Sequence, residues 1–583
     1  MSVYLHFDLG TREQWSEQPE GFSGPLHALG VLARVIDTYG PLRRLKVPVA
    51  LVTSTVGGLG AVGTDRCALV GVSPAMGGYV GETRAEGPYA AGMRAAGVTG
   101  ISLTGIADRL SYVVVSDGRA ELRDADGLWG MDTRTATEQL VARHGPGTAV
   151  AVIGPAGENL SAYANVVTCG DFPLPRRGFG TVLGFRKIKA IVCVPSGSAP
   201  VPADPAAVVR LGAAYRAEMP GHPLAGWQHA VPGFGAWSGT TIHPGQASVL
   251  NFSDTGTAPA AWPGLHPDRY AAYLARSGGG CPGCPNDCVK SYAGAGLHQE
   301  AVAMLGPNLG IADLGAILAA NARCQELGLD PVSLGGTLGC LFEAMDRGAV
   351  PGWPADTLPA GTGFGAADVL PELVERAACY GDPLGFGASA LGGRIGEQKF
   401  SMISRWDELP PFDPRVQPGL GLMYAAAPAG PRYDAIEHDL DFDPEHGLPH
   451  AFAEARRLGL TVPAPASVLD VERTIRLADL WSGLDALMIC PYASTPTRPL
   501  SLDRVAELVR AVTGRPFAPD DVFTLGRERL RRQQAINDRL GHGAGTLPDR
   551  FFDEPVAAGV HRGAVLDRAA FASGLARLRA AWS

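Results

Sequence analysis

The first 205 residues alternate short hydrophobic runs with turns that contain glycine and proline. Such alternation is typical of β-strands joined by tight turns. The runs that we predict as strands cover residues 47–54, 97–105, 111–118, 148–154 and 189–195. We therefore expect a β-rich N-terminal domain over residues 1–205.

Beyond residue 205 the hydrophobic positions recur at helical spacing. Asp or Ser stands near several starts of these patterns and Gly near several ends, as helix caps require. The predicted helices cover residues 205–219, 314–328, 467–489 and 503–514. Pro-rich stretches at 195–207 and 408–419 mark boundaries between domains. The chain is expected to be an α+β protein in which two mainly α-helical domains, 206–408 and 409–583, follow the β-rich one.

Composition narrows the class of protein. With 46% hydrophobic and 18% charged residues among 583, the chain has enough apolar surface for a large core and is not a disordered protein. A net charge of −9 argues against a nucleic-acid partner. The N-terminus shows no basic segment followed by an apolar run, and no stretch is apolar enough to span a membrane. We expect a soluble, cytoplasmic protein without membrane contact.

Three of the ten cysteines stand together in CPGCPNDC, as Cys281, Cys284 and Cys288. Three thiolates on one tight loop can hold three corners of a cubane iron–sulfur cluster, with a fourth ligand from elsewhere. Zinc is the competing hypothesis, although no second cysteine pair or histidine pair follows nearby. Cys490, at the end of a predicted helix, is the natural fourth ligand, but spacing alone does not favour it over the cysteines at 324 and 340.

Several separate motifs between about residues 60 and 495 resemble the aldehyde ferredoxin oxidoreductase family. They are GPAGENLSAYANVVT (154–168), RRGFGTVLGFRKIKAIV (176–192), CPGCPNDCVK (281–290), EAVAMLGPNLGIADLGAILAAN (300–321), CQELGLDPVSLG (324–335) and DALMIC (485–490). The resemblance implies a tungsten or molybdenum bis-pterin cofactor beside a [4Fe–4S] cluster, supported from below by the β-rich domain. It also implies that Cys490 is the fourth cluster ligand and that ferredoxin or a similar carrier exchanges electrons with the protein. A homodimer is the candidate assembly, and the sequence does not fix the oligomeric state.

The same resemblance assigns residues to the binding of the pterins. A magnesium ion is a further candidate cofactor. The cofactor-binding candidates are Arg66, Arg84, Arg176, Gly178, Gly180, Gln325, Gly328, Asp330, Asp485 and Ile489. Two positions depart from the family pattern. Gln325 replaces an aspartate, and Met488 stands where glycine is usual and is expected to add bulk beside the cofactor. Glu82 and Arg84 occupy the place of a loop that normally carries an asparagine near the magnesium.

For proton transfer with the substrate, the resemblance points first to Glu300. Tyr433 replaces a family histidine and His438 follows five residues later, so either could donate a hydrogen bond to a substrate oxygen. His298 is expected in the same pocket. These changes predict a remodelled substrate pocket around retained cofactors.

The resulting hypothesis is a ferredoxin-coupled oxidoreductase that acts on a small organic substrate in a two-electron step, an aldehyde or a specialised analogue. A family member that reduces an unsaturated or aromatic substrate is the alternative within the family. A repurposed non-redox biosynthetic or binding scaffold is the alternative from another class.

Overall fold

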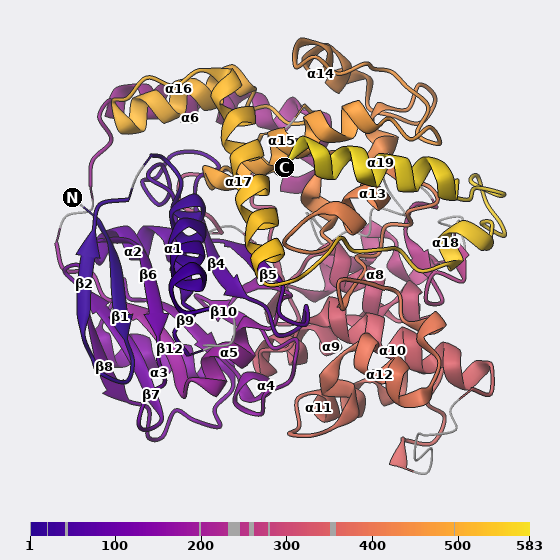
Figure 1. Cartoon of the computed structure of the whole chain (residues 1–583), viewed down its shortest axis with the longest axis horizontal. Helices are drawn as coiled ribbons and strands as arrows, with labels where there is room; N and C mark the ends of the chain where they lie inside the picture. Colours follow the sequence, from indigo (N-terminus) through magenta and orange to yellow (C-terminus); the bar gives the residue numbers. More distant parts are fainter. Residues whose placement is uncertain are drawn as a thin grey trace.

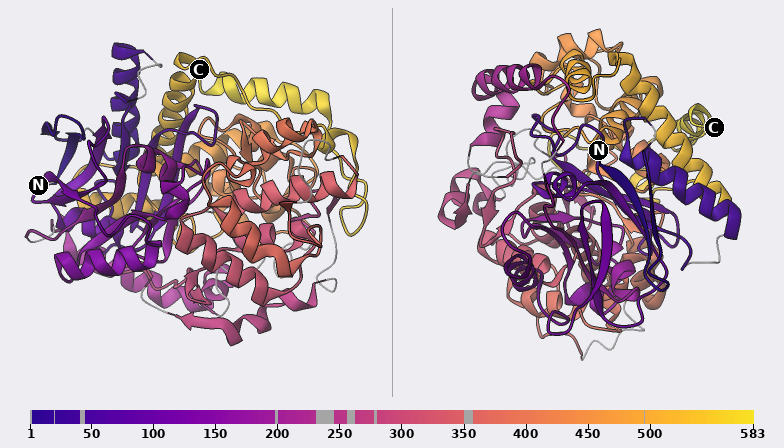
Figure 2. Two further views of the ribbon diagram at one scale, coloured as in Figure 1. Left: turned by 90° about the horizontal axis from the view of Figure 1, so that it is seen from below. Right: turned by 90° about the vertical axis from the view of Figure 1, so that its left-hand side faces the viewer.

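The structure is a computed structural model of the whole chain (Figure 1). It describes residues 2–19, 21–40, 45–197, 200–230, 245–255, 262–277, 280–349, 357–494 and 496–583. Residues 198–199, inside the first predicted boundary, lie outside these ranges. Two sheets built from the first 193 residues lie on one side of the molecule, and helices from the rest of the chain lie beside and above them (Figures 1 and 2).

Each of the two main sheets has six strands. The first, in spatial order, contains β2 (Gln14–Glu17), β1 (Val3–Asp8), β6 (Val98–Thr104), β3 (Val49–Val52), β4 (Arg66–Val72) and β5 (Val80–Glu86). The second contains β11 (Phe172–Leu174), β10 (Val166–Thr168), β9 (Ala149–Ile153), β12 (Ile188–Cys193), β7 (Ser111–Ser116) and β8 (Arg119–Asp124). One pair in each sheet is parallel, β1 with β6 and β7 with β12, and the other pairs are antiparallel.

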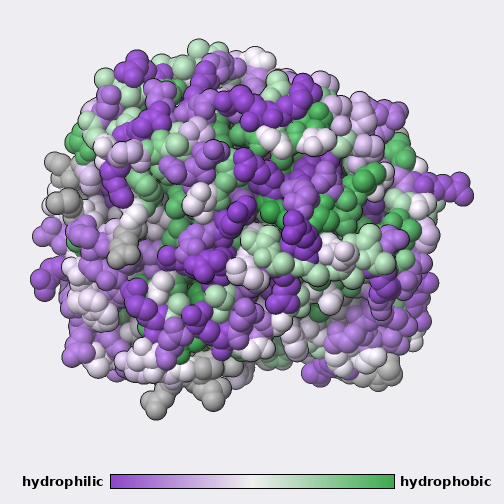
Figure 3. Space-filling view, turned by 45° about the horizontal axis from the view of Figure 1, so that its top comes forward, coloured by the Kyte–Doolittle hydropathy of each residue, from purple (hydrophilic) through white to green (hydrophobic). Residues whose placement is uncertain are grey.

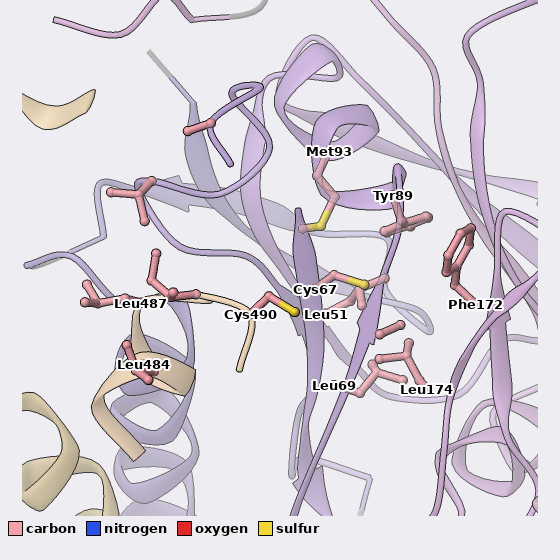
Figure 4. Close-up of a cluster of buried hydrophobic side chains, with 14 of the residues drawn as sticks. Leu51, Cys67, Leu69, Tyr89, Met93, Phe172, Leu174, Leu484, Leu487 and Cys490 are labelled. Carbon is pink, nitrogen blue, oxygen red and sulfur yellow. The ribbon is translucent and has the colours of Figure 1, made fainter. Parts of the chain in front are cut away.

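The two sheets share one hydrophobic core because successive side chains of a strand point to opposite faces. In β3, Leu51 belongs to the shared core, whereas Val52 packs with α1 (Gly24–Tyr39) on the outer face. In the second sheet, α3 (Thr133–His144) covers the outer face in the same way. Figure 4 shows Cys490 in the shared core, between Leu484 and Leu487 on one side and Leu51 and Cys67 on the other. This places the predicted fourth cluster ligand against the β-rich domain.

A helical layer built around α10 packs beside the sheets. Its hydrophobic core joins α8 (Gln299–Leu305), α9 (Leu314–Leu327), α10 (Pro331–Asp346), α11 (Leu370–Ala377) and α12 (Ala388–Ile395). Asp313 and Asp330 cap α9 and α10, each accepting a backbone N–H of the first turn. α10 is buried along nearly its whole length.

The C-terminal residues form a second group of helices with its own core. It contains α13 (Pro418–Ala426), α15 (Val471–Ala486) and α19 (Arg568–Ala581). α17 (Pro519–Arg539) packs along α15 and also reaches α1. α6 (Pro205–Glu218) and α16 (Leu502–Thr513) lie together at the top of Figure 1 and complete the core of the first sheet from that side.

The predicted fold class is confirmed, with β-rich sheets first and helices after them. All five predicted strands and all four predicted helices are present, with ends displaced by a few residues. The domain boundaries near 205 and 408 stay predictions. None of the helices in the described ranges has the length and apolarity to cross a membrane. Hydrophilic side chains interrupt the hydrophobic ones over most of the face in Figure 3.

Candidate active site

A cavity lies where the first sheet meets both groups of helices. The β4–β5 hairpin, residues 173–177, the start of α8, the α9–α10 junction and residues 431–434 all contribute to its wall. Segments that are far apart in the sequence therefore meet at one site. This is the expected arrangement for the motifs near 176–184 and 325–330, and Asp485 of the third motif contacts three arginines of the wall.

Five arginines line this cavity. They are Arg66, Arg84, Arg176, Arg177 and Arg432. Burial and the neighbouring charges of Arg176 and Arg432 lower the pKa of Arg177 well below its usual range. Burial and the charge of Arg432 lower the pKa of Arg84 to about 9. Such shifts mark cations held close together in a dry place, which an anionic group in the cavity would stabilise.

Asp485 supplies counter-charge from behind the cavity wall. Its carboxylate lies 3.1 Å from Arg66, 3.2 Å from Arg84 and 2.9 Å from Arg432. Although burial opposes ionisation, the surrounding arginines hold the pKa of Asp485 well below its usual range. Asp485 does not line the cavity, and Ile489 contributes its carbonyl oxygen, which accepts from Arg66 Nη1 at 3.2 Å. These two predicted pterin residues therefore position arginines of the wall.

The glycine-rich turn at 176–180 is strained and tightly packed. Arg176, Arg177 and Gly178 all adopt positive φ, between 64° and 68°, which only glycine does without cost. Both arginines contact the buried Asp407, which fixes them in this conformation. A Cβ on Gly178 would overlap the carbonyl oxygen of Ala162.

The glycines of the turn lie behind the cavity wall, and their role toward a pterin stays a prediction. Neither Gly178 nor Gly180 lines the cavity. Gly180 packs against the carbonyl of Asn165, and Gly328, with φ of 68°, packs against Gly154. The three glycines bring backbone segments of the protein together, and the arginine side chains beside the turn face the cavity.

We expect Gly178→Ala to lower the midpoint of thermal unfolding more than Gly170→Ala does. Both positions have positive φ, 68° and 87°, so the backbone strain of alanine is common to the two variants. Only at Gly178 does the added methyl group meet a backbone carbonyl, since nothing lies within 4 Å of a Cβ at Gly170. The extra cost is about 1–3 kcal/mol. Equal midpoints would contradict this packing role.

Gln325 and Asp330 both line the cavity at the α9–α10 junction. Gln325 Nε2 donates to the carbonyl of Gly170 at 2.6 Å. Asp330 accepts the backbone N–H of Ser333 with Oδ2, at 2.8 Å, as the N-cap of α10. Within the described residues, its Oδ1 and the Oδ1 of Asn165 are buried acceptors without a hydrogen-bond partner. A ligand that presents N–H groups would satisfy both oxygens.

Glu300, His298 and Tyr433 meet in the cavity wall, as predicted. Burial raises the pKa of Glu300 to about 8, so this carboxyl group can hold or release a proton near neutral pH. Burial lowers the pKa of His298. Tyr433 lines the cavity, whereas His438 lies behind it, with its Nε2 3.0 Å from the Tyr433 carbonyl oxygen and its ring 4.8 Å from that of Phe412.

Cys281, Cys284, Cys288 and Cys490 form one group of thiols. Every pair among the four interacts electrostatically, and burial raises the pKa of each. Cys490 N donates to the carbonyl of Gly63 at 2.7 Å, and Gly283 packs against the carbonyl of Gly60, so a loop of the N-terminal domain joins the two cysteine segments.

The spacing of the sulfur atoms separates the two metal hypotheses. Thiolates on one tetrahedral zinc lie about 3.8 Å apart, from a Zn–S distance of about 2.3 Å. In the described chain no three of these sulfur atoms lie within 4.8 Å of one another. The thiols are therefore not drawn together as on a single zinc ion, and a cubane cluster, whose irons carry the thiolates further apart, is the hypothesis that we retain.

The cysteine group and the cavity share a wall. Cys281 Sγ accepts the backbone N–H of Gly87 at 3.3 Å, and the adjacent Glu86 lines the cavity and pairs with Arg66 at 3.1 Å. Arg66 in turn contacts Ile489, next to Cys490. A redox group in the cavity and a cluster on the cysteines would thus be separated by a few residues.

One expectation needs correction. Met488 is buried among hydrophobic residues of α1, β3 and β4, and its side chain does not line the cavity. It does adopt φ of 59°, which explains why a glycine is suited to this position. Glu82 and Arg84 line the cavity, where the Glu82 carboxylate pairs with Arg84 and Arg529, and the magnesium ion stays a prediction. Among the described residues, no cluster of acidic or histidine ligands suited to magnesium lies at the cavity.

Sequence analysis missed several residues of the site. They are Arg177, Arg432, Asp434, Tyr492 and Asn165. Arg177 and Asn165 stand inside the quoted motifs, so these motifs could have identified both residues as members of the site. Arg432 and Asp434 form an ion pair at 2.8 Å in a short turn with no pattern in the sequence.

Comparison with known proteins agrees with this geometry. Residues 5–195 match the N-terminal domain of aldehyde ferredoxin oxidoreductase, and residues 211–578 match its domains 2 and 3. The tungsten-containing aldehyde ferredoxin oxidoreductase of Pyrococcus furiosus is 29% identical over 544 residues, covering 91% of this chain and 86% of that protein. The enzyme of the same name from Thermococcus kodakarensis is 29% identical over 547 residues, with the same coverage.

A solved structure shares the fold. The active-site complex BamBC of benzoyl coenzyme A reductase, in complex with 1,5-dienoyl-CoA, superposes with a TM-score of 0.77 at 19% identity, covering 93% of this chain and 89% of that one. At this identity the likeness concerns the architecture alone.

Proposed function

Because the chain belongs to the aldehyde ferredoxin oxidoreductase family, we propose that its cavity binds a tungsten or molybdenum bis-pterin and its four-cysteine group binds a [4Fe–4S] cluster. The protein is an oxidoreductase. The proposed reaction is a two-electron oxidation or reduction of a small organic substrate, with electrons exchanged singly with ferredoxin or a similar carrier. The observation that carries this proposal is the shared wall between the arginine-rich cavity and the four thiols.

The residues of the cavity fit a pterin with a phosphate group. Arg177 has a buried Nε without a hydrogen-bond partner among the described residues, and its pKa and that of Arg84 are lowered by burial and by neighbouring arginines. A phosphate would pair with such guanidinium groups through two parallel hydrogen bonds. The partnerless acceptors of Asp330 and Asn165 suit the N–H groups of a pterin ring.

When bound, the metal–pterin centre supplies the two-electron redox chemistry, and the cluster passes electrons onward. The chain's own residues do the rest. The arginines hold the phosphates, and Asp330 orients a pterin ring. A carboxyl oxygen of Glu300 exchanges a proton with the substrate carbonyl or with its hydrate. Tyr433 donates a hydrogen bond to a substrate oxygen, and His438 supports it from behind.

We expect Asp330→Ser and Asp330→Ala to separate the two roles of this residue. Serine keeps an N-cap acceptor for α10, whereas alanine loses it at a cost of about 1 kcal/mol. Both variants lose a charged hydrogen bond to the pterin, worth about 1.5–3 kcal/mol, or about tenfold or more in affinity. The measurement is pterin content per chain beside the thermal midpoint. A stable Asp330→Ser with full pterin content would show that Asp330 only caps the helix.

The pocket is expected to favour a larger or more specialised substrate than a simple aldehyde. Tyr433 and His298 both line the cavity where the family pattern has other residues. Tyrosine, with a pKa of about 10, donates a hydrogen bond but does not carry a proton at neutral pH as histidine does. Turnover of a panel of aliphatic and aromatic aldehydes, with a viologen dye as acceptor, tests this. Fast oxidation of acetaldehyde would contradict it, and reduction of an aromatic ring by reduced dye would favour the reductive alternative.

A further inference from the structure

Three side chains far from the cavity converge at the outer edge of the first sheet. His6 Nε2 lies 3.1 Å and His27 Nε2 lies 2.8 Å from the same oxygen of Glu17. All three ligand atoms lie within 4.8 Å of one another, and no other trio of His, Cys, Asp or Glu in the described ranges meets that limit. We propose that His6, Glu17 and His27 bind a divalent transition-metal ion, which we identify as Zn²⁺, at a site separate from the redox cofactors.

Backbone geometry brings the ligands together from three elements. In the β1–β2 hairpin Tyr4 pairs with Glu17 and His6 pairs with Trp15. Residues two apart on a strand share a face, so His6 and Glu17 are diagonal neighbours on one face of the hairpin. His27 lies in the first turn of α1, which Ser23 caps and which packs on that face.

Aromatic packing fixes both imidazole rings. The His6 ring stacks on Trp15 with centroids 4.4 Å apart, and the His27 ring meets the edge of Tyr4 at 4.3 Å. Tyr4 is itself held by a hydrogen bond to Ser102 at 2.6 Å. The two imidazole side chains are 8% and 7% exposed, so their rings are positioned without a ligand. A preorganised pair of imidazoles lowers the entropic cost of binding an ion.

The donor set is that of a zinc site. Two imidazole nitrogens and one carboxylate oxygen leave one tetrahedral position for water. Ligand atoms on one zinc lie about 3.3 Å apart for bonds of about 2.0–2.1 Å. The two imidazole–carboxylate contacts, at 3.1 Å and 2.8 Å, are within a few tenths of an ångström of that spacing, and the two imidazole nitrogens lie within 4.8 Å of each other. Arg34 lies 3.6 Å from the same Glu17 oxygen, but its side chain is 64% exposed and is free to turn to solvent.

The ion would act as a clamp. β2 is an edge strand in which no residue is fully buried. Its contribution to the sheet therefore rests on its pairing with β1 and on the few side chains that reach α1. A metal bound by one residue of each element would tie the hairpin to the helix. The alternative is a triad of hydrogen bonds, in which both imidazoles donate to Glu17 and no metal binds.

Zinc binding by the intact holoenzyme distinguishes the two. The protein is treated with a chelator, dialysed against Zn²⁺ and analysed for metal, and Co²⁺ is added to a parallel sample to record its visible spectrum. We expect about one equivalent of Zn²⁺ and a tetrahedral Co²⁺ spectrum. In Glu17→Gln and in His27→Gln, affinity should fall by about tenfold or more.

His266→Asn is the matched control, because His266 pairs with Asp268 at 2.8 Å and no third ligand joins them among the residues that the structure describes. This variant should bind zinc as the wild type does. If Glu17→Gln still binds one equivalent of Zn²⁺ with unchanged affinity, the proposed site is wrong. If equimolar Fe²⁺ displaces Zn²⁺ from the wild type, the identification of the ion as zinc is wrong. If the variants do not fold, hydrogen exchange of residues 3–17 in the wild type decides: slower exchange with Zn²⁺ supports the clamp, and no change overturns it.

Discussion

Cys284→Ala is expected to abolish the low-temperature electron paramagnetic resonance signal of the reduced [4Fe–4S] cluster, and with it electron transfer to an external acceptor. Cys284 is one of four thiols of which every pair interacts, and a cubane cluster needs all its thiolate ligands. Cys490→Ala should have the same effect, because its segment is joined to the cysteine loop through Gly63.

Cys324→Ala and Cys340→Ala are the matched controls. Both residues are buried cysteines in the core of the helical layer, and both were candidates for the fourth ligand on spacing alone. Their removal costs packing but should leave the signal and the iron content unchanged. Retention of the cluster signal in Cys490→Ala together with its loss in either control would refute the ligand assignment.

The second large effect is expected at the proton-transfer position. Glu300→Gln should lower turnover on the order of 10² or more while pterin and metal content stay at the wild-type level. Burial raises the pKa of Glu300 to about 8, and glutamine keeps the shape of the side chain but loses the exchangeable proton. Glu326→Gln, an equivalent change at a residue of α9 paired with Arg323, serves as the control and should keep full turnover.

The pH dependence gives this prediction a sign. In the oxidative direction Glu300 accepts a proton, so turnover should rise as pH increases through about 8, and Glu300→Gln should lose that limb. The contribution of Glu300 to the free energy of unfolding should instead fall as pH increases. The folded protein keeps a proton on Glu300 between about pH 4.5 and 8 that the unfolded chain has released, so this group destabilises the fold as pH rises. Glu300→Gln is thus expected to be no less stable than wild type at pH 8, and loss of pterin in this variant would contradict the role.

The sequence predicted the regular parts of the fold because their hydrophobic patterns are clear. The strand at 49–52 is an unbroken hydrophobic run, VALV, and the hydrophobic positions of the helix at 314–327 recur with a period of about 3.6 residues. The β4–β5 hairpin was missed because β5, VGETRAE, carries three charged side chains that are all buried. Its charges are neutralised by arginines from other segments, such as Arg529 on α17, and this long-range pairing leaves no local pattern.

The residues of the site that were predicted are those that stand in recognisable motifs. The cysteine loop, Glu300 and Asp330 were found because each stands in a run with a chemical or family signal. The sequence did not predict which of these residues face the cavity and which lie behind its wall. Tyr433 lines the cavity while His438 lies behind it, and Asp485 holds arginines rather than facing the cavity. Such distinctions depend on which side of a turn faces inward, and that is fixed by packing between distant segments.

Metal and pterin analysis of anaerobically purified protein is the decisive experiment on the two proposed cofactors. We expect about four iron atoms in a [4Fe–4S] cluster and about one tungsten or molybdenum atom with two pterins per chain, beside broad brown absorption near 400 nm. A colourless, folded protein without iron and pterin after strictly anaerobic preparation would contradict this expectation, and would favour a scaffold that has lost its redox chemistry.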